Sequence, residues 1–251
     1  MKKLIIMLAA LTLAGCSGKN EFVRVADFES AQIRVYYPQF SRLDLSCGTM
    51  PAQTDESVVF CCEAAFTEAL LDTFCHTNID GNHVSDGVWY RGTDCVETAD
   101  HVGNTGGFVW YPAAGHERGK WEFFADTLSA EQALLKTARS GGMGFRQEAI
   151  IHCSAYVPNV RTTNPRFNRV EHFRVLAQFD GQLCIIDNTC PMLFSDFLDK
   201  LLCLGVQEAL YLDMGAGWNH SWYRLPDGST CEIHPRAAKS RYCTNWLTFY
   251  R

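Results

Sequence analysis

The stretch FRVLAQFDGQLCIID, residues 173–187, decides the fold. It holds two apolar runs rich in β-branched and aromatic residues, and the pair Asp180-Gly181 lies between them. An Asp-Gly pair in this position favours a two-residue β-turn, because both turn residues must adopt positive φ angles. The stretch therefore predicts a tight antiparallel hairpin formed by residues 173–179 and 182–187.

Strand-like and helix-like patterns surround this hairpin. β-Branched and aromatic runs predict further strands at residues 31–37, 57–62, 149–151, 206–212 and 221–225. Apolar residues spaced by three and four predict helices at residues 63–74, 129–139 and 195–204. Ser129 is the expected N-cap of the second helix, and Gly205 ends the third. Because strict β-α-β alternation and internal repeats are absent, we expect one α+β domain with a mixed, mainly antiparallel β-sheet core flanked by helices.

The composition is that of an ordinary globular protein. The chain has 251 residues, of which 47% are hydrophobic and 20% charged. These values argue against a disordered chain and against a coiled coil. The formal net charge is -6 and no dense basic run is present, so nucleic acid is not expected as the main partner.

The N-terminus has the pattern of a lipoprotein export signal. Lys2 and Lys3 precede an apolar run at residues 4–13, and Ala14-Gly15 places small residues before Cys16. The apolar run is shorter than the ~20 residues that a transmembrane helix needs. We therefore expect a signal peptide at residues 1–15, a lipidated Cys16 that begins a tether to residue 30, and a domain at residues 31–251. This predicts a bacterial cell-envelope protein, periplasmic or surface-facing, that contacts the membrane only through its lipid anchor.

Cysteine is abundant, with twelve residues in the chain. Removing Cys16 leaves an odd number, so at least one thiol stays free. We expect a few disulfides and several buried thiols, the latter in the apolar runs around Cys61, Cys184 and Cys203. No pair of Cys-x-x-Cys motifs is present, so a structural zinc site is not expected. No cofactor is required by the sequence, and a calcium site in the acidic loop 80–86 lacks EF-hand spacing.

Two acidic residues stand where apolar strands end. Asp187 closes the second strand of the hairpin, and Asp213 follows the strand ALYL and precedes Gly215 and Gly217. Glycines allow a backbone to approach a ligand closely, and exposed amides can bind an anion. Two carboxylates roughly 5–10 Å apart can cleave a glycosidic bond. The alternative for each Asp is a simple turn or capping role.

Three further residues are candidates for a site. Arg174 offers a planar set of donors that suits phosphate, although a surface ion pair is its commoner role. Glu63 ends a strand and can supply a carboxylate or open the following helix. His220 can act as acid or base, or pack against Trp218 and Trp222. The neighbours His152-Cys153 and Cys75-His76 are disfavoured as thiol–imidazole pairs, because adjacent strand residues point to opposite faces.

The order of these features resembles the C-terminal half of the phosphodiester glycosidase family over roughly residues 145–225. The chain and the family share the following order of features: a strand that begins with Arg, an Asp-Gly turn, a strand that ends with Asp, a helix, and ALYLD before a Gly-rich loop. The resemblance implies hydrolysis of a sugar-1-phosphodiester, and many bacterial lipoproteins are similar to this family. Arg174 and Asp187 stand at its R-T/S-A-I/L-G and V-D-G patterns, and Asp213, Gly215 and Ser221 at its L-D-G-G-G-S-S signature.

The chain departs from the family at four places. The residues Val175-Leu176-Ala177-Gln178 differ from those that follow the family's Arg, and Asn188 stands where the V-D-G pattern has Gly. Met214 replaces the first Gly of the signature, and Trp218-Asn219-His220 intervene before Ser221. The family's N-G-G pattern is missing at residues 59–66. In this chain, residues 60–66 are FCCEAAF and contain neither Asn nor Gly. Added side chains change the shape of any pocket there.

These observations predict an exported hydrolase that acts on a sugar-1-phosphodiester or related glycoside of a phosphorylated glycan. The expected catalytic residues are Asp213, Asp187 and His220, and the expected substrate-binding residues are Arg174, Gly215, Gly217, Ser221, Glu63 and Trp218. The alternative is a noncatalytic glycan-binding lipoprotein on the same fold, favoured by the altered motifs and by tryptophans that can stack on sugars: Trp89, Trp110, Trp121, Trp218 and Trp222. A third possibility is an assembly protein of the envelope.

Overall fold

The computed structural model describes residues 21–67, 73–93, 105–113, 119–157, 168–214 and 219–251. Within these ranges the chain is mostly β-strand with two α-helices, and every strand pair is antiparallel. The predicted α+β class with a mainly antiparallel core in a single domain is confirmed. The signal peptide, Cys16 and residues 17–20 lie outside the described residues. Residues 21–30, expected as part of the tether, instead contain the strand β1 (Val23–Phe28) and the start of a 3₁₀ helix at Glu29.

The predicted hairpin lies in the middle of the largest sheet. The order of this seven-stranded sheet is β1 (Val23–Phe28), β2 (Ile33–Pro38), β14 (Gln182–Asn188), β13 (Arg174–Phe179), β16 (Glu208–Tyr211), β10 (Ala149–His152) and β11 (Ala155–Tyr156). Asp180 and Gly181 have φ angles of 51° and 69°, as the Asp-Gly turn requires. The turn fixes the register of β13 against β14, in which Arg174 lies opposite Asp187.

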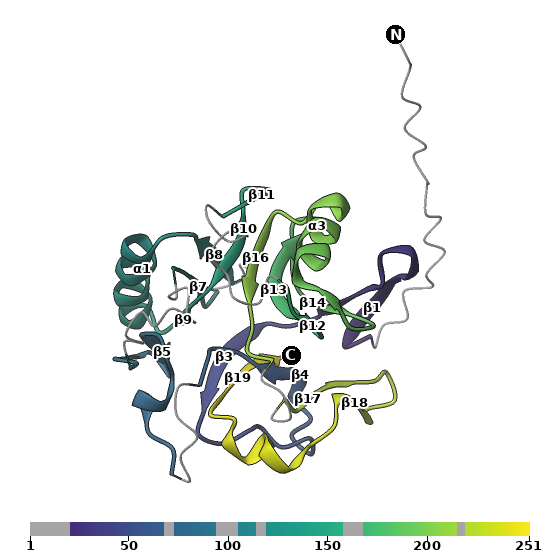
Figure 1. Cartoon of the computed structure of the whole chain (residues 1–251). Coiled ribbons are helices and arrows are strands. Elements are labelled where there is room, and N and C mark those ends of the chain that lie inside the picture. The colour runs from purple at the N-terminus through teal and green to yellow at the C-terminus, as the bar shows by residue number, and fades with distance from the viewer. Residues whose placement is uncertain (1–20, 68–72, 94–104, 114–118, 158–167, 215–218) are drawn as a thin grey trace.

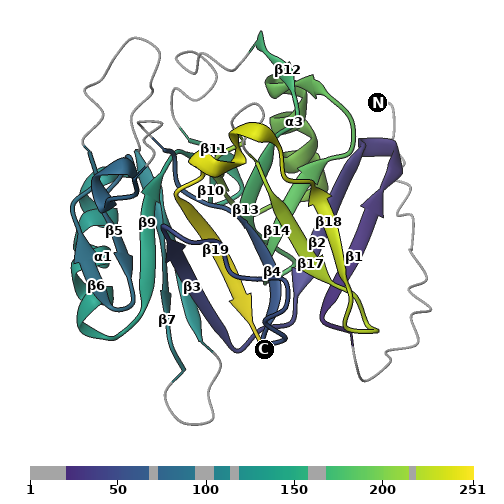
Figure 2. The ribbon, with the colours of Figure 1, turned by 90° about the horizontal axis from the view of Figure 1, so that it is seen from below.

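Two five-stranded sheets and one short ribbon complete the strands. The second sheet has the order β18 (Thr230–His234), β17 (Ser221–Arg224), β4 (Val58–Glu63), β19 (Asn245–Tyr250) and β3 (Arg42–Cys47). The third has the order β6 (Val88–Tyr90), β5 (His83–Ser85), β9 (Met143–Gln147), β7 (Gly106–Tyr111) and β8 (Lys120–Phe124). A ribbon pairs β12 (Val170–Glu171) with β15 (Met192–Leu193). Figure 2 shows the second sheet side by side with the third.

The main core lies between the three sheets. Leu176 and Ile185 from the first sheet, Phe60 from the second, and Phe108 and Phe145 from the third are all buried in one apolar cluster. Alternate residues of each strand point to this shared core, since successive side chains of a strand face opposite ways. The three sheets therefore stabilise one another.

The two α-helices cover the outer faces of two sheets (Figure 1). Helix α3 (Phe194–Leu204) buries Phe197, Leu198 and Leu201 against the first sheet. Helix α1 (Thr127–Arg139) packs Ala133 and Leu134 against Val84 and Val109 of the third. The short 3₁₀ helices are η1 (Glu29–Ala31), η2 (His76–Asn78) and η4 (Ala238–Tyr242). Among the described residues, no helix combines the length and apolar character needed to cross a bilayer.

Some local predictions are wrong. The helix expected at residues 63–74 is not formed by its described residues, because Glu63 belongs to β4 and Thr67 forms an isolated bridge with Ile79. The N-cap of α1 is Asp126, whose side chain accepts the Ser129 N–H at 2.8 Å, so Ser129 is not the cap. Helix α3 ends at Gly205 as predicted, with φ of 90°.

The expected disulfides are also absent from the described part of the chain. Its ten cysteines are all free thiols: Cys47, Cys61, Cys62, Cys75, Cys153, Cys184, Cys190, Cys203, Cys231 and Cys243. Cys61 and Cys184 are buried, as predicted, where they pack as small apolar residues, whereas Cys203 is exposed. Burial raises the pKa of both buried thiols, so they stay protonated.

Candidate functional site

A group of buried polar side chains lies where the ends of strands from two sheets meet. Glu63 ends β4, Arg174 begins β13, Asp187 lies near the end of β14, and Ser221 begins β17. The exposed fractions are 0% for Arg174 and Ser221, 3% for Glu63 and 5% for Asp187. Charged side chains are rarely buried this completely unless they pair with one another. We call these four residues the buried charge cluster.

The Arg174 guanidinium occupies the centre of the buried charge cluster. Its Nε and Nη2 donate to the two carboxylate oxygens of Asp187 at 2.8 and 2.7 Å. Its Nη1 donates to the Ser221 hydroxyl at 2.9 Å and to a Glu63 oxygen at 3.3 Å. The fork of donors on Arg suits this bidentate arrangement, and the pairing offsets the cost of burying the charges.

Burial also determines the protonation of Glu63. One of its oxygens contacts Arg174, and the other accepts the His220 backbone N–H and lies 3.9 Å from the Cys243 sulfur. Burial raises the pKa of Glu63 to about 8, against the opposing attraction of the Arg174 guanidinium. Asp213 adds to this rise. Glu63 therefore carries a proton at neutral pH, which makes it able to act as an acid.

Asp213 lies against the chain that leaves β4. Its backbone N–H donates to the Ala64 carbonyl at 3.0 Å, and its carboxylate accepts the Thr67 N–H at 3.4 Å. Unlike the buried charge cluster, Asp213 is partly exposed. The structure thus brings Asp213 close enough to Glu63 to influence its titration, although the two are 150 positions apart in the sequence.

Two histidines flank the buried charge cluster. The His220 backbone bonds to Glu63, and its ring lies 3.4 Å from the Glu232 carboxylate. The His234 ring lies 4.0 Å from the Asp187 carboxylate. Burial, reinforced by repulsion from Arg174, lowers the pKa of His234 to about 4, so this ring is neutral. Sequence reasoning missed His234 because no motif marks it, and only the register of β17 with β18 brings it near Ser221.

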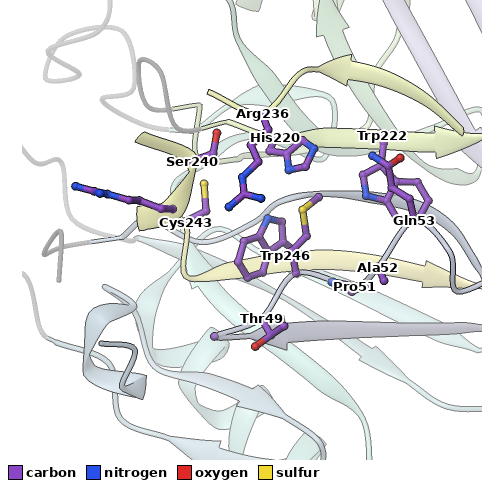
Figure 3. A pocket seen from close by; sticks show the side chains of 13 residues that line it. Thr49, Pro51, Ala52, Gln53, His220, Trp222, Arg236, Ser240, Cys243 and Trp246 are labelled. Atoms are coloured by element: carbon purple, nitrogen blue, oxygen red, sulfur yellow. The ribbon is translucent and has the colours of Figure 1, made fainter. Parts of the chain in front are cut away.

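An open pocket of about 490 Å³ adjoins the buried charge cluster. His220 and Cys243 belong both to the pocket lining and to the surroundings of Glu63. Figure 3 shows Arg236 with its guanidinium directed into this pocket, near Trp246. The wall opposite is formed by the loop 48–53. Trp222 and Trp246 border the pocket but are buried, with exposed fractions of 0% and 5%, so the exposed guanidinium of Arg236 is the feature that suits a negatively charged ligand.

The structure brings together most, but not all, of the predicted site residues. Arg174, Asp187, Glu63 and Ser221 form one cluster, and Asp213 and His220 lie beside it. Gly215, Gly217 and Trp218 lie outside the described residues. Of the other predicted tryptophans, Trp222 lines the pocket, and three belong to the third sheet: Trp89, Trp110 and Trp121.

Several pocket residues were not predicted from the sequence. Arg236, Cys243 and Trp246 lie near the C-terminus, beyond the stretch that resembles a known family. Arg236 follows a Pro and belongs to no recognisable motif, so the local sequence did not indicate a binding role for it. Their place in the pocket depends on β19 pairing with β4, which returns the end of the chain to Glu63.

Comparison with known proteins gives a match at the level of fold. No sequence profile of a protein family matches the chain, and no curated protein sequence matches it. Among solved structures, the chain is similar to the catalytic domain of zebrafish N-acetylglucosamine-1-phosphodiester alpha-N-acetylglucosaminidase, described as auto-inhibited by its pro-peptide. The TM-score is 0.57 and the sequence identity 11%, over 92% of this chain and 82% of that chain. The two chains therefore share a fold.

Proposed function

We propose that this protein is a hydrolase of a sugar-1-phosphodiester or a related glycoside. One observation carries the proposal: the carboxyl groups of Glu63 and Asp187 bind one arginine beside an open pocket, and the Asp213 carboxyl lies near enough to Glu63 to raise its pKa. The similarity in fold to a domain of a phosphodiester glycosidase supports it. We further propose a lipid-anchored protein of the bacterial envelope, periplasmic or surface-facing, with phosphorylated glycans as partners.

In this proposal, the residues divide between chemistry and positioning. Asp213, which is partly exposed, acts at the sugar, and His220, which lines the pocket, moves a proton. Asp187 stays a predicted catalytic residue, but both of its oxygens bind Arg174, which favours a positioning role. Glu63 is 3% exposed and both of its oxygens contact protein groups, so in this proposal it holds Arg174 and the His220 backbone in position.

The phosphate requires a cation that a ligand can reach. Arg174 is completely buried and already donates four hydrogen bonds, so its role in this proposal is to hold the carboxylates. Arg236 is exposed, extends into the pocket, and has no ion pair among the residues that the structure describes (Figure 3). We assign the phosphate to Arg236, together with the predicted backbone amides of Gly215 and Gly217.

The test is hydrolysis of a sugar-1-phosphodiester by the purified protein. Asp213→Ala and the closer isostere Asp213→Asn should each lower kcat by at least ~10²-fold, as expected for loss of an acid–base or nucleophilic group. Arg236→Gln should mainly raise KM. Glu122→Ala, which removes an exposed carboxylate on β8, is the matched control and should leave both constants unchanged. Full turnover by the Asp213 variants would remove Asp213 from the chemistry.

A second candidate function is noncatalytic glycan binding. The observation that favours it is the mutual neutralisation of Arg174 and Asp187 inside the protein, since such a pair can be structural. Titration calorimetry with a phosphorylated glycan distinguishes the two functions. Saturable binding that Arg236→Gln weakens, with no product after long incubation, would favour the binding protein over the hydrolase.

A further inference from the structure

A second group of chemically reactive side chains lies outside the buried charge cluster. Cys47 ends β3, His76 begins η2, and His83 begins β5. One potential metal-ligand atom from each residue lies within 4.8 Å of the other two. The three residues come from separate segments, so tertiary folding, and no sequence motif, brings them together.

The hydrogen bonds of His83 determine which ring nitrogen is free. Nδ1 lies 3.1 Å from the Gly81 carbonyl oxygen, which can only accept, so Nδ1 carries the proton. Burial lowers the pKa of His83 to about 4, and the ring is therefore neutral. Nε2 therefore has the lone pair and accepts the His76 Nδ1–H at 2.9 Å. A ring that donates one N–H to a carbonyl and directs its other nitrogen inward has the orientation typical of a metal ligand.

The His76 ring is held in place by its neighbours. It stacks on the Tyr90 ring and meets the Phe74 ring edge-on. The Asn78 side chain accepts the Cys75 backbone N–H at 2.7 Å, which fixes the start of η2. Burial lowers the pKa of His76 as well, so a lone pair is available at neutral pH. These contacts leave little freedom for the imidazole to turn away.

The thiol of Cys47 completes the group. Cys47 is half-buried and free, and its sulfur lies 3.6 Å from the Leu45 carbonyl. Burial raises the pKa of the thiol to about 12, with Ser85 as a hydrogen-bonding neighbour. Asp86, in the turn after β5, adds a negative potential at both Cys47 and His76. The local field therefore favours a cation.

We infer that Cys47, His76 and His83 form a zinc site that joins β3, η2 and β5. One thiolate and two imidazoles are ligands that Zn²⁺ prefers, and they supply three of its four tetrahedral positions. With Zn–N bonds of about 2.0–2.1 Å, the two coordinating nitrogens stand roughly 3.3 Å apart. The observed 2.9 Å separation needs only a small opening to reach this value.

Binding the ion exchanges one proton. The Cys47 S–H bond breaks, its sulfur forms the Zn–S bond, and the proton passes to solvent. The His76 Nδ1–H bond also breaks, and Nε2 of the same ring takes up a proton from solvent, so Nδ1 gains a lone pair for zinc and both imidazoles stay neutral. Because binding releases a proton, the apparent zinc affinity should rise with pH. The titratable groups that face the thiol are His76, His83 and Asp86.

A zinc ion at this site would restrain the loop 48–53, which lines the pocket. Gly48 follows Cys47 directly and opens the loop that lines the pocket wall. A Cβ on Gly48 would come within 2.6 Å of the Phe74 ring, and that ring contacts His76. Zinc at Cys47 therefore fixes the position at which this loop begins.

The test is the metal content and zinc affinity of the purified full chain, without a polyhistidine tag. One zinc per chain is expected after equilibration with Zn²⁺ and gel filtration. Cys47→Ser and His83→Asn should each weaken zinc binding by at least about tenfold. The matched controls are Cys153→Ser and His152→Gln, because His152, Cys153 and Glu208 form the other group of potential ligands among the described residues.

Cobalt provides a readout that does not depend on stability. Co²⁺ bound to the wild-type chain should show intense tetrahedral bands and a thiolate charge-transfer band, and Cys47→Ser should lose the latter. A chelator should lower the Tm of the wild type. If a variant does not fold, the zinc content and cobalt spectrum of the wild type decide the question. No zinc retained by the wild type, or zinc lost only from the His152 and Cys153 variants, would overturn the site.

Discussion

The described part of the chain contains two Arg–Asp ion pairs with the same geometry, and one of them is formed by Arg174. It lies opposite Asp187 in the hairpin and is completely buried. Arg34 lies opposite Asp27 in the β1–β2 hairpin and makes the same two-pronged contact, at 2.6 and 3.0 Å. This second pair is 43% and 45% exposed. The chain thus carries a buried and an exposed version of the same ion pair.

The two pairs should differ in their contribution to stability. Arg174→Met leaves Asp187 buried without its partner and should lower the free energy of unfolding by about 3–5 kcal/mol. Arg34→Met should change it by at most about 1 kcal/mol, since exposed pairs are solvated and screened. Urea unfolding measures both variants. Equal effects would contradict the argument, and Asp187→Leu added to Arg174→Met should recover part of the loss.

Glu63 should make stability depend on pH. Its pKa rises from an ordinary value of 4.5 to about 8 in the folded protein, so the folded state holds a proton that the unfolded state releases. This contribution is complete below pH 4.5 and is lost as the pH rises towards 8, with a slope approaching ~1.4 kcal/mol per pH unit. Glu63→Gln should remove it. Urea unfolding between pH 5 and 8 gives the free energy of unfolding of the wild type and of Glu63→Gln. If the two free energies change with pH in parallel, the raised pKa of Glu63 is refuted.

At the scale of elements, capping decides where α1 begins. Asp126 accepts the Ser129 N–H at 2.8 Å, which satisfies one of the free amides of the first turn. Asp126→Ala should therefore lower the free energy of unfolding by about 1 kcal/mol. Ser129→Ala serves as the control and should change it by less than ~0.5 kcal/mol. Thermal unfolding measures both variants. If they lower the free energy of unfolding by the same amount, Asp126 is not the cap.

The hairpin β13–β14 determines the relative position of two residues of the buried charge cluster. Its turn sets the register, and the register places Arg174 opposite Asp187. A shift of one strand by one residue would put Arg174 and Asp187 on opposite faces of the sheet, since strand side chains alternate. The geometry of the buried charge cluster thus begins with the positive φ angles of Asp180 and Gly181.

At the scale of the whole molecule, one apolar core joins three sheets. Phe60 of the second sheet packs against Tyr36 of the first, with ring centroids 5.5 Å apart, and against Phe249 of its own sheet at 5.7 Å. Because no sheet buries its inner face alone, we expect the domain to unfold cooperatively.

Phe60→Ala tests this cooperativity. The cavity should lower the free energy of unfolding by about 3–5 kcal/mol. Near-ultraviolet and far-ultraviolet circular dichroism should report the same shifted transition, because loss of the second sheet removes the support of the others. Val170→Ala, at an exposed position, is the control and should leave the transition in place. Two separate transitions in the Phe60 variant would show that the sheets unfold independently.

Local sequence information accounts for much of the fold. The Asp180-Gly181 turn, the end of α3 at Gly205 and seven of the nineteen strands in the described part of the chain follow from residue type and spacing, because turn and cap chemistry act within a few residues. The helix predicted to begin at Glu63 does not begin there, because Glu63 still belongs to β4 and pairs with β19; residues 68–72 lie outside the described part of the chain. The Asp187–Arg174 pair was within reach of the sequence, since the hairpin register implies it.

The sequence by itself determined the α+β class and the central hairpin, and it singled out Arg174, Asp187 and Glu63 as candidates for a site. Only the tertiary structure decided which of them meet: Arg174 and Glu63 are 111 positions apart and belong to different sheets. The same holds for the pocket and for Cys47, His76 and His83. The physical reason is that burial of the shared apolar core sets how the sheets pack, and the polar groups at their ends come together as a consequence.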